Sequence, residues 1–66
     1  MEFVSSNIQS GDYDEASKTL LITFNTGRRY EHYGVPQELW EALKDAGSKG
    51  RFYSQFIKGK FAYAEV

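Results

Sequence analysis

The clearest alternation of apolar and polar positions lies in residues 18–24, KTLLITF, where Leu20, Ile22 and Phe24 share one face. The β-branched and aromatic content of this stretch favours a strand over a helical turn. Before it, residues 8–13, IQSGDY, predict a weaker first strand, which we expect at a sheet edge and which its glycine weakens. The polar stretch DEAS separates the two strands as a turn.

A third strand follows a loop formed by residues 25–27, NTG. This spacing suits a three-residue hairpin loop whose last residue, Gly27, takes a positive φ without steric cost. The loop places Tyr30 and His32 on the apolar face of residues 18–24. A two-residue turn would place them on the other face, because side chains alternate along a strand.

The three-residue loop turns Arg29 and Tyr33 to the opposite, open face, beside Leu21 and Thr23. A half-bare sheet that displays arginine and tyrosine resembles the surfaces on which single-stranded RNA is stacked. An antiparallel sheet with one face in water, however, needs no ligand. The open face is therefore either a binding surface or an ordinary solvated face.

Helical periodicity replaces strand alternation after the third strand. Pro36 suits the first turn of a helix, and PQELWEALKDAG carries leucines and alanines at helical spacing up to its terminal glycine. Ser48 is a candidate cap for a second helix over residues 49–57, in which Phe52 and Phe56 stand four apart. The expected core collects the large apolar side chains of these elements: Ile22, Phe24, Trp40, Phe52 and Phe56.

These elements predict a single α+β domain over residues 1–66. The architecture is a three-stranded antiparallel β-meander followed by two α-helices on one face, β-β-β-α-α. Residues 61–66, FAYAEV, add a short C-terminal strand or a tail packed on the body. A domain of 66 residues is marginal in stability, so the five Phe, five Tyr and one Trp matter as core material.

Composition argues against several kinds of site. The chain has no cysteine, which excludes disulfides and thiolate sites, and its one histidine leaves no zinc site without unusual carboxylate ligands. No spacing joins a serine to His32 and an acid as nucleophilic catalysis requires. No segment has signal-peptide order, and no apolar run reaches the ~18 residues that span a bilayer. We therefore expect a cytoplasmic protein that is not an enzyme, needs no cofactor and has no membrane partner.

Charge is segregated along the chain although the net charge is only −1. Residues 1–17 carry four acids and no base, whereas residues 48–60 carry four bases and no acid. Lys49 and Arg51 stand at the start of the second predicted helix, where free N–H groups and cations converge on anions. The stretch GSKGR around them is equally a common helix connection.

The whole pattern resembles the KTSC domain, a family found at the C-terminus of some lysyl-tRNA synthetases and alone in short bacterial and phage proteins. The matching features run from Val4 to Val66: Ser5-Ser6 before Ile8, Tyr13-Asp14, Leu20 to Phe24, Gly34-Val35-Pro36, the series Ala46, Ser48, Gly50 and Phe52, and Ile57-Lys58. The family's central signature is Tyr-x-Tyr. Tyr30 fits its first position, whereas His32 stands at the second and is followed by Tyr33. The resemblance implies a domain of unknown function for which RNA binding has been proposed.

Two functional hypotheses follow from these observations. The first is a non-enzymatic nucleic-acid-binding module, with single-stranded RNA or tRNA as partner, in which cations contact phosphate and tyrosines contact bases. Its candidate residues are Arg28, Arg29, Tyr30, Tyr33, Lys49, Arg51, Lys58 and Lys60. The second is a protein-interaction or self-association module that uses an edge strand or the open face, with Leu21 and Tyr33 as anchors. Near-neutral charge favours the second hypothesis, and the family resemblance favours the first.

Overall fold

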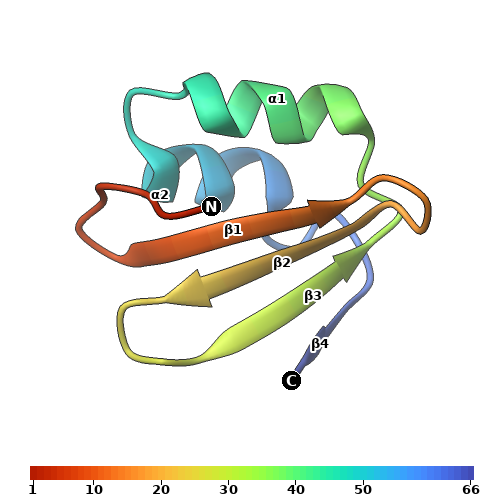
Figure 1. Cartoon of the computed structure of the whole chain (residues 1–66), viewed down its shortest axis with the longest axis horizontal. Helices are drawn as coiled ribbons and strands as arrows, with labels where there is room; N and C mark the ends of the chain where they lie inside the picture. The colour runs from red at the N-terminus through yellow and green to blue at the C-terminus, as the bar shows by residue number, and fades with distance from the viewer.

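The computed structural model describes residues 1–66 (Figure 1). It contains four strands, a first helix and a second helix whose last part is π-helical. The elements in chain order are β1 (Ile8–Asp14), β2 (Thr19–Phe24), β3 (Arg29–Tyr33), α1 (Gln37–Asp45), α2 (Lys49–Phe52), η1 (Tyr53–Ile57) and β4 (Tyr63–Glu65). The segment η1 is a π-helical continuation of α2. The predicted α+β class and element order are confirmed, and the C-terminal segment is a strand. No helix is both long and apolar enough to cross a membrane.

The strands form one antiparallel sheet in the order β1-β2-β3-β4. Ile22 pairs with Tyr30 and Leu20 with His32, as the three-residue loop predicts. Gly27 takes a φ of 94°, a conformation that glycine adopts without a Cβ clash. The predicted register of the hairpin and the assignment of its two faces are therefore correct.

The N-terminal segment runs along the outer edge of β1. The Phe3 amide donates to the Gln9 carbonyl, and the Gly11 amide donates to the Met1 carbonyl, both at 2.9 Å. These bonds occupy backbone groups that an edge strand otherwise leaves unpaired. At the other side of the sheet, β4 pairs only with β3, and its three residues are exposed. The sheet thus has one edge that the N-terminal segment partly covers and one free edge.

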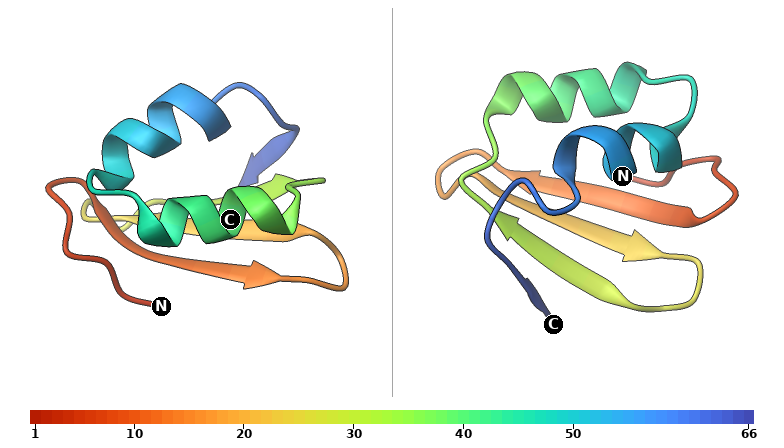
Figure 2. Two further views of the ribbon diagram at one scale, coloured as in Figure 1. Left: turned by 90° about the horizontal axis from the view of Figure 1, so that it is seen from above. Right: turned by 180° about the vertical axis from the view of Figure 1, so that it is seen from behind.

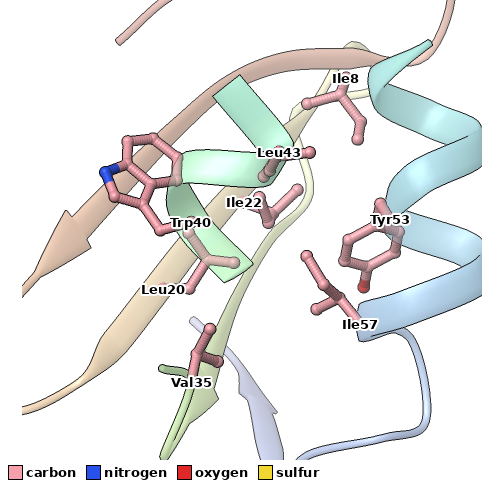
Figure 3. Packing of buried hydrophobic residues seen from close by; sticks show 8 residues of the cluster. All are labelled: Ile8, Leu20, Ile22, Val35, Trp40, Leu43, Tyr53 and Ile57. Atoms are coloured by element: carbon pink, nitrogen blue, oxygen red, sulfur yellow. The ribbon is translucent and has the colours of Figure 1, made fainter. Parts of the chain in front are cut away.

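The helices lie together on one side of the sheet, as the two views of Figure 2 show. The core between these layers consists of Ile8, Leu20, Ile22, Val35, Trp40, Leu43, Tyr53 and Ile57 (Figure 3). Seven of these side chains are aliphatic or indole groups that remove apolar surface from water, the main driving force of folding. Ser48 accepts a hydrogen bond from the Arg51 amide and caps α2, as predicted.

The second helix buries a different pair of residues from the predicted pair. Phe56 is 47% exposed and Phe52 is only half-buried, so the prediction that both are core residues is wrong for Phe56. Tyr53 and Ile57, also four apart but one position further along, face the sheet instead. Both spacings are helical, and the orientation of the helix around its axis decides between them. Phe52 and Phe56 pack on each other at 4.8 Å between ring centroids.

Candidate functional site

A groove lies where the helix-facing sides of β3 and β4 meet η1, and it encloses about 570 Å³. Its volume falls within the ~300–1,000 Å³ typical of small-molecule sites. Five rings line it: Phe24, Tyr30, His32, Tyr53 and Tyr63. We call this feature the aromatic groove.

The rings of the aromatic groove form a closed circuit of contacts. Successive ring centroids lie between 5.3 and 6.1 Å apart, within the usual range for aromatic pairs. The circuit runs from Phe24 to Tyr30, Tyr63, His32 and Tyr53 and back to Phe24. Tyr63 is 60% exposed, so its ring also offers surface to a ligand.

Four elements position these rings, and β2 contributes Phe24 at its end. Tyr30 and His32 alternate on β3, and Tyr63 lies opposite His32 on β4, so the strand pleat turns all three side chains toward the helices. Tyr53 reaches them from η1, where the Lys58 amide donates to the Tyr53 carbonyl in an i to i−5 bond. Such π turns occur frequently at functional sites.

His32 is the most deeply buried polar residue of the groove, with 1% of its surface exposed. Its Nε2 lies 2.9 Å from the Tyr53 hydroxyl, and its Nδ1 lies 3.4 Å from the Leu20 carbonyl. Burial lowers the pKa of His32, although the backbone carbonyls oppose this shift. Burial also raises the pKa of Tyr53. The imidazole is thus neutral and the phenol protonated at pH 7.

The rim of the groove is basic. Arg28 and Lys58 line it, and the lining contains no Asp or Glu. The hydrogen bond with Tyr30 and then the Glu65 carboxylate raise the pKa of Arg28. The Arg28 Nε lies 3.9 Å from the Glu65 Oε2 in an exposed pair, a contact too long and too wet to hold the guanidinium firmly. Both cations therefore remain accessible to an anionic ligand.

The open face of the sheet carries acids that the groove lining lacks, although the Met1 ammonium pairs with Asp12 at 2.7 Å. Arg29 and Tyr33 are exposed there, as predicted, but a shallow hollow on that face is lined by Asp12, Asp14 and Glu31 and by no base. The Tyr33 hydroxyl donates to the Glu31 carboxylate at 3.0 Å, which raises the pKa of Tyr33. These acids would repel phosphate. Arg29 and Tyr33 are thus separated from the aromatic groove by the sheet.

Lys49 is occupied by a structural contact. Its Nζ donates to the Lys44 and Ala46 carbonyls at 2.9 and 2.6 Å, where it satisfies acceptors at the C-terminal end of α1. The same ammonium lies 5.4 Å from the centroid of the Phe3 ring. Arg51 is exposed on α2, which has only four residues. Neither residue lines the aromatic groove.

Of the eight candidate residues from the sequence, the structure brings three together in the groove: Arg28, Tyr30 and Lys58. Lys60 is exposed and follows Gly59, the last groove residue before β4. The ring contributions of Phe24, His32, Tyr53 and Tyr63 were not predicted from the sequence. Alternation alone could have linked His32 to Tyr30, because both lie on one face of β3. No local signal pairs Tyr63 with His32.

The fold and the groove define a small α+β domain with a ligand-sized aromatic cavity between its sheet edge and its second helix. The chain belongs to the KTSC domain family, whose model matches residues 4–61. It is 37% identical to a KTSC domain protein from Yersinia pestis of known crystal structure, with a TM-score of 0.95, over 100% of this chain and 93% of that one. The resemblance seen in the sequence is thereby confirmed.

Relatives of two kinds share this domain. A lysine–tRNA ligase from Nostoc punctiforme is 39% identical over 92% of this chain, which spans only 11% of the ligase. A short protein from Tsukamurella paurometabola is 39% identical over 86% of this chain and 85% of its own length. The domain therefore occurs as a small part of a large enzyme and as most of a short protein.

Proposed function

We propose that this chain is a small non-enzymatic module that binds single-stranded RNA in the aromatic groove. The observation that carries the proposal is the composition of the groove: five rings, two cations and no acid among its lining residues. Aromatic rings stack with the flat faces of bases, and cations neutralise phosphates. The acidic open face of the sheet lacks this combination.

Single strands suit the groove better than duplexes. A base can contact a ring only when it leaves its own stack, which occurs in loops, bulges and ends. In the proposed complex, Tyr63 and Tyr30 contact the base while Arg28 and Lys58 contact the phosphates on either side. The exposed Lys60 extends this basic rim along the backbone of the strand. The similarity to enzymes named lysine–tRNA ligases agrees with an RNA ligand.

A second candidate function, protein interaction, is favoured by the free edge of the sheet. All three residues of β4 are exposed, and only one edge of β4 is paired. An extended peptide could add a strand there through backbone hydrogen bonds. Leu21 is half-buried on the open face and Tyr33 is 39% exposed, so that face offers a less apolar surface than the sequence suggested.

The test of RNA binding uses fluorescence anisotropy with a labelled single-stranded oligoribonucleotide at 50 and 200 mM salt. Tyr63→Ala should weaken binding about tenfold, since one stacked base is worth ~1–3 kcal/mol. Arg28→Ala should weaken it and reduce the salt dependence by about one phosphate contact. The matched controls Tyr33→Ala and Arg29→Ala change the same residue types on the open face and should bind as the natural chain does.

Two results would contradict the proposal. One is an absence of binding at low salt, and the other is equal loss in the groove variants and their open-face controls. Circular dichroism of each variant verifies that the fold is intact. A chain that binds no RNA but elutes as a dimer in size-exclusion chromatography would favour the protein-interaction function.

A further inference from the structure

The inner wall of the aromatic groove contains a hydrogen-bonded pair of side chains, His32 and Tyr53. The His32 Nδ1 lies 3.4 Å from the Leu20 carbonyl oxygen, and its Nε2 lies 2.9 Å from the Tyr53 hydroxyl. Figure 3 shows the Tyr53 ring projecting from its helix into the space between helix and sheet. Both side chains line the groove although they are largely buried.

The direction of these hydrogen bonds follows from which atoms can donate a proton and which can only accept one. A carbonyl oxygen can only accept, so the His32 Nδ1 carries the proton that is donated to Leu20. A neutral imidazole then has an unprotonated Nε2, which accepts the hydroxyl proton of Tyr53. The Tyr53 oxygen has thereby used its only proton and makes no other hydrogen bond. Toward the groove it offers lone pairs alone.

From this geometry we infer that the groove selects nucleobases that carry an exocyclic amine, with an amine N–H donated to the Tyr53 hydroxyl oxygen. This inference rests on the proposed function, because it specifies which base the same groove prefers. An exocyclic amine projects beyond the ring, so it reaches a recessed oxygen while the base contacts Tyr63. Adenine, cytosine and guanine carry such an amine.

Uracil lacks this group. Its one ring N–H on the pairing edge lies between two carbonyl oxygens, which would face the lone pairs of the Tyr53 oxygen. A base that presents acceptors to this oxygen is disfavoured, because lone pairs then face lone pairs with no proton between them. The groove should therefore bind cytidine strands more tightly than uridine strands.

The experiment compares probes that differ in one amine. Anisotropy titrations use oligomers of adenosine against oligomers of purine riboside, which lacks the amine, and oligomers of cytidine against uridine. The natural chain should bind the amine-bearing member about fivefold more tightly in each pair, the value of one neutral hydrogen bond. Tyr53→Phe should abolish both preferences while it keeps binding to the purine riboside oligomer.

The possible outcomes distinguish a failure of the amine preference from a failure of RNA binding itself. Binding of all probes without an amine preference overturns the inference and leaves RNA binding in place. A preference that persists in Tyr53→Phe also overturns it, since the contact then lies elsewhere. Binding of none of the probes at low salt overturns both. The comparison in the natural chain needs no variant, so a folding defect in Tyr53→Phe cannot obscure it.

Discussion

The packing of the second helix makes a quantitative prediction about two neighbouring residues. Ile57 is completely buried against the sheet, whereas Phe56 is 47% exposed. Replacing a buried isoleucine by alanine removes three carbons from the core and costs ~2–5 kcal/mol. A domain of this size has a total stability of only about 3–10 kcal/mol, so Ile57→Ala should remove a large part of it.

Phe56→Ala should have a much smaller effect. The Phe56 ring keeps about half of its surface in water and contacts Phe52, at 4.8 Å between ring centroids. Such pairs are worth ~0.5–1.5 kcal/mol beyond the apolar area that they bury, and only about half of the Phe56 surface is buried. Although phenylalanine is the larger side chain, Phe56 should contribute less to the free energy of unfolding than Ile57, because Phe56 is far more exposed.

Thermal unfolding followed by circular dichroism measures both effects. For a domain of this length each kcal/mol lowers Tm by roughly 4–8 °C. We expect Ile57→Ala to lower Tm by about 10 °C or more. The milder Ile57→Val, at ~0.5–1.5 kcal/mol, should fall between the natural chain and Ile57→Ala. A Tm for Phe56→Ala as low as that for Ile57→Ala would refute this orientation of the helix.

Three further predictions concern the charged and titratable groups. Because burial lowers the pKa of His32 in the folded chain, the unfolded chain binds this proton more tightly. The free energy of unfolding should therefore be highest above pH ~6.5 and fall as the pH drops from there toward the folded-state pKa. Urea unfolding at pH 7.5 and 5.5 measures this change. His32→Gln should lose this dependence, and an unchanged slope would contradict it. Lys49→Met should cost about 1 kcal/mol in urea unfolding, because the carbonyls of Lys44 and Ala46 at the C-terminal end of α1 lose their donor. It should leave RNA affinity unchanged, and weaker binding would assign Lys49 to the interface. Glu65→Gln should raise RNA affinity a few-fold in anisotropy titrations, since it removes the acid beside Arg28, and lower affinity would show that this pair orders the site.

Much of the sheet could be predicted because its signals are local. The alternation in β2 and the glycine of the hairpin loop together determine the register, and the observed pairs of Leu20 with His32 and Ile22 with Tyr30 agree with it. The capping serine of the second helix is likewise a local signal. Each of these features depends on residues only a few positions apart.

The aromatic groove depends on contacts between distant segments. Tyr63 pairs with His32 across 31 positions through a strand of only three exposed residues, which has no apolar pattern of its own. The choice of Tyr53 and Ile57 over Phe52 and Phe56 depends on a rotation of the helix, and both pairs have the same spacing. The sequence therefore indicated the cations and one tyrosine of the groove, while tertiary packing supplies its other rings.

The unequal edges of the sheet limit how copies of this chain can associate through strands. The N-terminal segment occupies the outer edge of β1 with its own backbone bonds, so a second molecule cannot pair along the same stretch. The outer edge of β4 is free along its whole length, and two copies that join β4 to β4 use up both of these edges. That contact is isologous and closes on itself. Strand pairing between copies would thus end at a dimer with a continuous sheet, and growth into fibres would require the N-terminal segment to detach first.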